Sequence, residues 1–296
     1  MRRILVWLVV LGVVGLAAFW FITQPKTHPE SALAGLTGDA TRGEAVFWAG
    51  GCASCHADEK ATGEAKLILS GGRRLASPFG DFIVPNISPD PAEGIGGWSA
   101  LDLANAMQLG TSPDGEHYYP AFPFSSYAKA SLQDVVDLKT FLDTLPVSDR
   151  KNQPHELGFP FNIRLSLGGW KLLFTSKDWV VGDDLTPAET RGRYLAEALA
   201  HCGECHTPRN PLGGPTRSRW LAGAPDPSGK GTIPNITPAK MTWSEAQLVE
   251  YFTSGFTPEF DSVGGHMAYV VDNLAHLPES DRAAIAAYLK KVPASE

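Results

Sequence analysis

The most apolar part of the chain is its amino-terminal end. After Met1-Arg2-Arg3, an uncharged apolar run of 19 residues extends from residue 4 to residue 22. At a rise of about 1.5 Å per helical residue, a run of this length spans roughly the 30 Å of a bilayer core. Trp7 and Trp20 lie near its two ends, where aromatic rings favour the membrane interface. The pattern therefore predicts a transmembrane helix, and residues 1–25 are expected to form a membrane anchor.

The charges beside this helix predict its orientation. Arg2 and Arg3 precede it, and basic residues stay on the cytoplasmic side, so the rest of the chain is expected outside the cytoplasm. A cleaved signal peptide is the alternative, but its apolar region normally has about 7–15 residues with a small-x-small site directly after it. The best such site, Ala32-Leu33-Ala34, lies well downstream, which favours an uncleaved anchor.

Beyond residue 37, the pattern of apolar and polar positions occurs twice. Each copy opens with an apolar-patterned helix, continues through a Pro-Asn loop, and then has a helix that starts at Trp-Ser and ends at Gly. Ser favours the start of a helix and Gly its end. The paired landmarks are Thr41-Arg42-Gly43 and Thr190-Arg191-Gly192, Pro85-Asn86-Ile87-Ser88 and Pro234-Asn235-Ile236-Thr237, Trp98-Ser99 and Trp243-Ser244, and Gly110 and Gly255.

This repetition predicts an all-α fold in which two tandem domains follow the amino-terminal helix. We place the first domain at residues 37–146 and the second at residues 187–293. The linker between them, residues 147–186, is rich in aromatic residues. A flexible linker would be polar and rich in Gly and Ser, so this one is expected either to pack across the two domains or to form a surface connection with a few buried anchors.

Composition and charge agree with this organisation and narrow the function. The chain has 296 residues, of which 43% are hydrophobic and 19% are charged, which is typical of a globular protein with two domains of ordinary size. Its formal net charge is −7. A negative protein is a poor ligand for the phosphate backbone, so we expect no nucleic acid partner.

A five-residue motif follows the first helix of each unit. It reads Cys52-Ala53-Ser54-Cys55-His56 in the first and Cys202-Gly203-Glu204-Cys205-His206 in the second. Cys-x-x-Cys-His is the attachment signature of c-type haem; the thiols bond to the haem, and the adjacent His binds the iron. We therefore expect two covalently bound haems c, held by Cys52, Cys55 and His56 and by Cys202, Cys205 and His206.

Other uses of these cysteines are less consistent with the pattern. A thioredoxin-like redox pair would be one Cys-x-x-Cys near a βαβ pattern, usually without the His. A structural zinc site would need four ligands brought together, which the two motifs could supply as four cysteines. Disulfides form in exported chains, but a disulfide that closes a loop of two residues would constrain the fold very little. The motifs contain the only four cysteines in the chain, so the haem interpretation accounts for every thiol.

The exported part resembles the c-type cytochromes related to the cytochrome subunits of bacterial membrane-bound alcohol, aldehyde and gluconate dehydrogenases. The similar segments are the stretch from His201 to Asn210, the two Pro-Asn-Ile-Ser/Thr loops, and the stretch from His117 to Pro123. The resemblance covers about 250 residues and implies two α-helical cytochrome c domains. This chain differs in having two haem motifs, where those subunits typically have three, and an amino-terminal anchor.

The same resemblance implies a role in electron transfer. The protein would lie at the bacterial inner membrane with its domains facing the periplasm. It would accept electrons from a periplasmic or membrane dehydrogenase and pass them to a quinone, a cytochrome or an oxidase. The alternative is a dihaem enzyme, similar to a peroxidase or to a thiosulfate-oxidising enzyme, with an open first haem as its catalytic site.

The sixth iron ligand is expected to differ between the two haems. Cytochrome c domains usually supply a Met from a later loop, and Met267 lies 12 residues after Gly255 in such a loop. The same spacing from Gly110 gives Phe122, which cannot bind iron. His117 in that loop is one candidate ligand for the first iron, and an open or water-bound iron beside Phe122 is the other. Met107 is expected to be a core residue.

Overall fold

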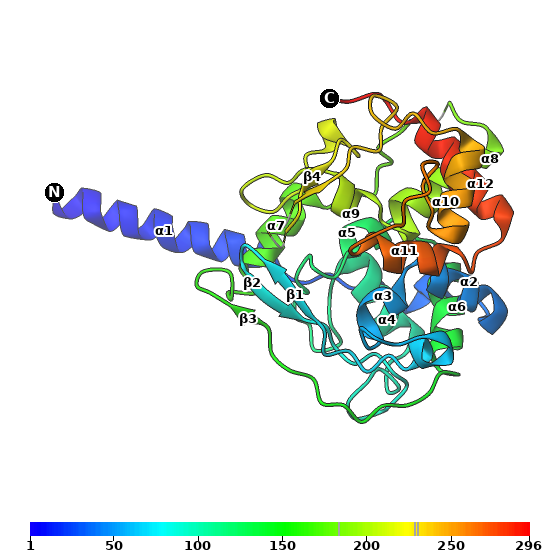
Figure 1. Ribbon diagram of the computed structural model, residues 1–296. Helices are drawn as coiled ribbons and strands as arrows, with labels where there is room; N and C mark the ends of the chain where they lie inside the picture. Colours follow the sequence, from blue (N-terminus) through cyan, green and yellow to red (C-terminus); the bar gives the residue numbers. More distant parts are fainter. Residues whose placement is uncertain (183, 228, 230) are drawn as a thin grey trace.

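A computed structural model describes residues 1–182, 184–227, 229 and 231–296. Helix α1 (Arg2–Ile22) projects from the body that the rest of the chain forms (Figure 1). None of its residues is buried. Within the described part of the chain, α1 is the one helix long and apolar enough to cross a membrane, judged by length and composition alone. The predicted amino-terminal helix is therefore confirmed as a helix.

The body repeats one order of helices, with a connecting segment between the two copies. In each copy, a first helix is followed by a short helix with the cysteine motif, a capped helix, and two further helices. The first copy contains η1 (Glu30–Leu33), α2 (Ala40–Ala49), α3 (Cys52–His56), η2 (Gly63–Leu67), β1 (Arg74–Ser77), β2 (Gly80–Ile83), α4 (Ala100–Leu109), α5 (Phe124–Tyr127) and α6 (Leu132–Leu142). The connecting segment contains β3 (Glu156–Leu157) and α7 (Ser166–Phe174). The second copy contains α8 (Pro187–Arg193), η3 (Tyr194–Leu199), α9 (Gly203–His206), η4 (Arg217–Arg219), β4 (Ala224–Pro225), β5 (Thr232–Ile233), α10 (Glu245–Ser254), α11 (Met267–Leu274) and α12 (Glu279–Lys291).

The capped helix begins and ends as the sequence predicts in both copies. Ser99 and Ser244 form capping boxes at the starts of α4 and α10. Gly110 and Gly255 end these helices in the left-handed conformation, with φ of 59° and 78°. A side chain would be strained at such angles, which explains the glycines.

The first and last helices of each copy cross at a glycine. A Cβ added to Gly43 would lie 2.1 Å from the carbonyl oxygen of Asp137, and one added to Gly192 would lie 1.9 Å from that of Ala284. Only glycine allows the backbones to approach so closely. The preceding arginines pair with the last helix, Arg42 with Asp137 and Arg191 with Asp281. The repeated Thr-Arg-Gly sequence therefore holds α2 against α6 and α8 against α12.

The second copy has one additional residue before its cysteine motif. Cys52 follows Gly43 by nine residues, whereas Cys202 follows Gly192 by ten. The structure accommodates the additional residue as a π-helix, η3, in which the amide of Ala200 donates to the carbonyl of Leu195 at 2.7 Å. A π-helical turn takes up one inserted residue without breaking the helix, so both copies deliver the motif from the same helix end.

The expectation of an all-α fold is only partly correct, because the body also contains short strands. β1, β2 and β3 form an antiparallel sheet, with Arg74 opposite Ile83 and Asp81 opposite Glu156. β4 and β5 form a second antiparallel pair. These strands have two to four residues each, too few to give a recognisable alternating pattern, and β3 joins its sheet only through tertiary contact.

The two copies share one core. Buried apolar side chains from both copies, among them Phe47, Leu142, Leu195 and Ile285, belong to a single cluster. The connecting segment contributes Val181 to the same cluster. The division into domains at 37–146 and 187–293 stays a prediction, and the shared core indicates that the two halves stabilise one another.

Candidate haem attachment sites

The first motif forms the short helix α3, and its histidine is oriented by a loop. Nδ1 of His56 lies 2.8 Å from the carbonyl oxygen of Pro85. Since a carbonyl can only accept, Nδ1 bears the proton and Nε2 keeps its lone pair. Burial lowers the pKa of His56 to about 4, so the ring is neutral at physiological pH. A neutral imidazole with a free Nε2 is the form that binds iron.

The second motif repeats this arrangement at α9. Nδ1 of His206 lies 2.8 Å from the carbonyl oxygen of Pro234. Burial lowers the pKa of His206 as well. Gly51 and His201, which directly precede the two motifs, both have positive φ, 64° and 40°. The chain therefore enters both motifs through the same left-handed turn, although a non-glycine residue occupies it in the second.

The two Pro-Asn loops hold the orienting carbonyls in place. Asn86 accepts from the amide of Ser88 at 2.9 Å and donates to the carbonyl of Ser148 at 2.7 Å. Asn235 accepts from the amide of Thr237 at 2.8 Å and donates to the carbonyl of Ser295 at 2.7 Å. Each Asn thus ties its loop to the segment after the last helix of its copy. The repeated loops can be recognised in the sequence. Their contacts with the histidines cannot, because each loop carbonyl is 28 or 29 residues from the histidine that it orients.

All four thiols have raised pKa values and stay protonated, although Cys52, Cys55 and Cys202 are only partly buried and Cys205 is exposed. Burial raises the pKa of Cys52 and of Cys202 to about 12 each. Burial, Glu204 and the nearby thiol of Cys55 together raise the pKa of Cys205 to about 11.

These residues fit a covalently attached haem. Each site combines two thiols from one short helix with a neutral histidine whose Nδ1 is already bonded. When bound, haem c supplies an iron that takes up and releases one electron; Cys52, Cys55 and His56 would hold one such group and Cys202, Cys205 and His206 the other. Among the described residues, no three His, Cys, Asp or Glu side chains are grouped as a bare metal ion requires.

The two loops after the capped helices have the same hydrogen-bond register. The amide of Tyr118 donates to the carbonyl of Gly110, and that of Val263 donates to the carbonyl of Gly255, at 2.8 Å in both cases. Phe122 follows Tyr118 by four residues, and Met267 follows Val263 by four residues, so the two have equivalent positions in the sequence. Both side chains are partly buried against the shared core. The two loops thus share their register up to Tyr118 and Val263, and the equivalence of Phe122 and Met267, the first residue of α11, stays a prediction.

His117 lies in the first of these loops, but both of its ring nitrogens have other partners. Nε2 lies 2.8 Å from the carbonyl oxygen of Thr23, and Nδ1 lies 2.9 Å from Nζ of Lys171. The ring is buried, with 5% of its surface exposed. Iron binding by His117 stays a prediction, and it would require one of these two bonds to break. Met107 lies buried in α4 as part of the core, which agrees with its expected role.

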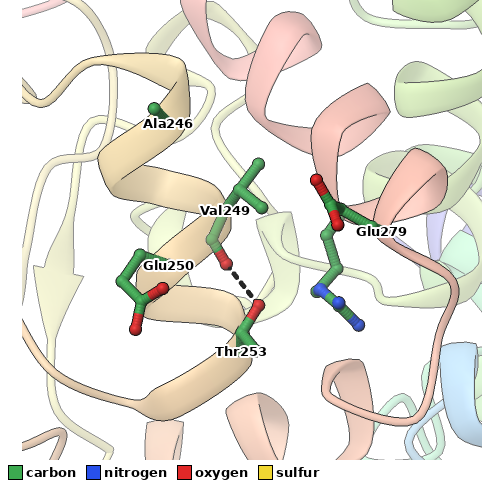
Figure 2. A pocket seen from close by; sticks show the side chains of 6 residues that line it. Ala246, Val249, Glu250, Thr253 and Glu279 are labelled. Atoms are coloured by element: carbon green, nitrogen blue, oxygen red, sulfur yellow. Dashed lines mark hydrogen bonds between the residues drawn. The ribbon is translucent and has the colours of Figure 1, made fainter.

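A groove of about 380 Å³ lies away from the motifs, between α10 and the start of α12 (Figure 2). Its lining consists of Ala246, Val249, Glu250, Thr253, Glu279 and Arg282. The Thr253 hydroxyl donates to the carbonyl of Val249 at 2.7 Å and so is satisfied within its own helix. The groove contains no residue of either attachment motif.

The fold and the paired attachment sites define a class of electron-transfer protein, and comparison with known sequences agrees. The profile of the Cytochrome c family matches residues 40–146. The chain belongs to the c-type cytochromes, with two covalently bound haems c. It is similar to a protein named Diheme cytochrome c-type from Cereibacter sphaeroides, with 61% identity over 295 residues that cover 100% of this chain and 99% of that protein.

More distant relatives are subunits of dehydrogenases. The Fructose dehydrogenase cytochrome subunit of Gluconobacter japonicus is 37% identical over 86% of this chain, and the Gluconate 2-dehydrogenase cytochrome c subunit of Pantoea cypripedii is 32% identical over 86% of it. The chain spans only 52% and 60% of the length of these two proteins. The resemblance stated from the motifs is therefore confirmed.

Proposed function

We propose that the protein is a membrane-anchored electron relay of the bacterial periplasm. It takes electrons one at a time from a periplasmic or membrane dehydrogenase and passes them to a quinone, a cytochrome or an oxidase. The dehydrogenase subunits among its relatives support this kind of donor. The length and apolar composition of α1 support the anchor.

The observation on which this proposal mainly rests is the proximity of the two attachment sites. Tyr127 lies between them: its hydroxyl donates to the carbonyl of Gly50 at 2.8 Å, and its ring centre is 5.6 Å from that of His201. Burial raises the pKa of Tyr127, with further contributions from Cys52, Cys55 and Glu204. Groups from both motifs are thus close to one phenol, so two haems attached here would be neighbours, as a relay requires.

Contacts across the two copies would keep this spacing fixed. The side-chain amide of Asn273 donates to the Ser54 hydroxyl at 2.7 Å, which connects α11 to the first motif. The hydroxyls of Ser125 and Ser126 donate to Glu204 in the second motif, at 3.1 and 2.7 Å. Each motif is therefore bonded to the opposite copy, and a fixed distance between two redox centres supports transfer within the molecule.

The two irons would differ in their sixth ligand. Met267, 12 residues after Gly255, would supply the sixth ligand of the second iron, which His206 would hold from the attachment motif. Phe122 occupies the equivalent position in the first copy, and His117 is bonded elsewhere. We infer that the first iron has His56 as its only protein ligand. This difference in axial ligation would separate the two reduction potentials.

The same position of Phe122 favours a second candidate function, a dihaem enzyme that binds a small molecule at the first iron. Spectroscopy of the oxidised protein discriminates between the two. A high-spin signal that changes on addition of peroxide, with peroxide consumed at the expense of an electron donor, would establish the enzyme. A spectrum that peroxide leaves unchanged would support the relay.

The relay itself is tested in the host. Membranes from a strain lacking the gene should lose oxygen uptake driven by one or more alcohols, aldehydes, sugars or sugar acids. The intact gene should restore it, whereas Cys52→Ser/Cys55→Ser, which removes the attachment of the first haem, should not. Unchanged uptake with every such substrate would refute the proposed place in respiration.

A further inference from the structure

The end of the apolar helix α1 is built into the body. Thr23, the residue directly after α1, is 2% exposed. Its carbonyl oxygen accepts from Nε2 of His117 at 2.8 Å. A Cβ added to Gly168 in α7 would lie 2.3 Å from the same oxygen. This contact fits only glycine, so Thr23 is held between the first copy and α7.

Helix α7 is fixed to the same place by Lys171. Its Nζ donates to the carbonyls of Leu109 and Gly110, at 2.8 and 2.6 Å, and to Nδ1 of His117 at 2.9 Å. One turn back along α1, the ring of Phe19 would lie 3.2 Å from a Cβ added to Gly169. The last turn of α1 therefore packs directly on α7, and the two helices meet beside the body (Figure 1).

The outer side of this junction is strongly apolar. Leu172 and Leu173 of α7 are 53% and 70% exposed. Other exposed apolar side chains come from the segment before α7 and from the loop after α9. We call the whole set the linker apolar surface, which consists of Phe159, Phe161, Ile163, Leu172, Leu173 and Leu212.

The parts of this surface are in contact although they come from distant segments. Phe161 packs on Phe79 with ring centres 4.8 Å apart, and Phe79 would lie 3.2 Å from a Cβ added to Gly213. The indole of Trp170 donates to the carbonyl of Leu212 at 3.0 Å. The connecting segment, the β1–β2 turn and the loop after α9 thus form one continuous region.

We propose that the linker apolar surface rests in the interfacial region of the periplasmic leaflet of the bilayer that α1 spans. This rests on the proposed function, in which α1 is an uncleaved anchor. The membrane boundary would lie close to Ile22, the end of α1, and Phe19 already packs on α7 one turn inside that boundary. Exposed apolar side chains at that level are covered by lipid, whereas in water they would form a patch of the kind that marks an interaction site.

Such a contact would set the orientation of the two attachment sites relative to the membrane. A single transmembrane helix followed by a free tether would let the body tumble. Here the helix end is bonded to the body and a second apolar contact lies beside it, so the body is held at two points.

Site-directed labelling of the full-length holoprotein in lipid nanodiscs tests this surface. All four native cysteines are used for haem attachment, so an added cysteine takes a fluorophore specifically. Leu173→Cys and Leu212→Cys report on the surface from two segments, and Val147→Cys, at a residue 66% exposed after α6, is the matched control. The readout is the ratio of fluorescence in discs with and without lipid that bears a shallow nitroxide quencher. Haem quenches a given label equally in both kinds of disc, so its effect cancels in the ratio.

We expect loss of fluorescence at positions 173 and 212 and none at position 147. Carbonate extraction of membranes, done in parallel, shows whether α1 holds the protein in the bilayer. Retention in the membrane with no quenching at positions 173 and 212 would overturn the proposed surface and leave the anchor intact. Release of the protein by carbonate would overturn the anchor and the surface with it.

Discussion

Replacement of Glu197 by Gln tests whether the two copies and the connecting segment form one structural unit. The side chain of Glu197 is fully buried. Its Oε2 accepts from Nζ of Lys129 at 3.1 Å and from the amide of Val180 at 2.8 Å. Its Oε1 accepts from the hydroxyl of Tyr288 at 2.8 Å and from the amide of Val181 at 3.2 Å. One carboxylate thus joins the first copy, the connecting segment and the last helix.

Glu197→Gln keeps the shape of the side chain but removes its charge and one acceptor. Removal of one partner of a buried ion pair costs about 3–5 kcal/mol of unfolding free energy, because the remaining charge stays in a poorly solvated site. Lys129 is such a charge, since desolvation already lowers its pKa. For a protein of this size class, 1 kcal/mol corresponds to about 2–4 °C in Tm, so we expect Tm to fall by about 6–20 °C.

The assay is thermal unfolding of the full-length holoprotein in detergent, followed by circular dichroism in the far ultraviolet and in the Soret region. Glu296→Gln is the matched control, because Glu296 pairs with Lys240 and both side chains are exposed, 85% and 59%, and such pairs contribute at most about 1 kcal/mol. A fall in Tm for Glu197→Gln no larger than for the control would refute the assigned role. Separate transitions for the two haems in the native protein would refute the shared core.

The remaining predictions concern the iron ligands and acid stability. Met267→Ala should abolish the weak absorption near 700 nm that Met-ligated ferric haem gives, while mass spectrometry still finds both haems; an unchanged band would refute Met267 as a ligand. Phe122→Met should increase that band and decrease any high-spin signal, and no change would show that the loop cannot reach the first iron. His117→Ala should leave both haem spectra unchanged and lower Tm through loss of the Thr23 contact, whereas a newly high-spin haem would identify it as a ligand. Burial alone would raise the pKa of Asp137, but the bonds from Arg42, the Asp39 amide and Gln133 hold it below its usual range. This stabilisation is present above the unfolded pKa of about 4 and is lost as pH falls through the lower folded pKa. Asp137→Asn should therefore be less stable than the native protein at pH 7, and its unfolding free energy should fall less on acidification. Equal falls for the two proteins would contradict this.

The attachment sites could be predicted because their chemistry is local in sequence. Cys52, Cys55 and His56 lie within five residues, and the capping residues of α4 and α10 are adjacent to the helices that they end. The twofold pattern located the equivalent positions Phe122 and Met267, since a duplicated chain keeps its spacing. The motif and the caps depend on residues a few positions apart, and the repeat depends on comparing two stretches of the same sequence.

The rest depends on contacts between residues far apart in the chain. His117 was a candidate ligand because of its loop, but its partners are Thr23 and Lys171, 94 and 54 residues away. The Pro85 and Pro234 carbonyls lie 29 and 28 residues from the histidines that they orient, and the short strand β3 pairs with β2 from the other side of the first copy. Spacing in one chain contains no information on such pairs, so they become visible only in the folded structure.

The single core that surrounds both attachment sites also has an electrical consequence. Residues of both motifs pack on that core, so a charge placed at one iron would be less screened at the other than it would be in bulk water. Reduction of one bound haem would make reduction of the other less favourable, so the two potentials would belong to the pair. A potential measured on either half alone would therefore not describe the intact protein, which would operate close to half-reduced over a wide range of applied potential.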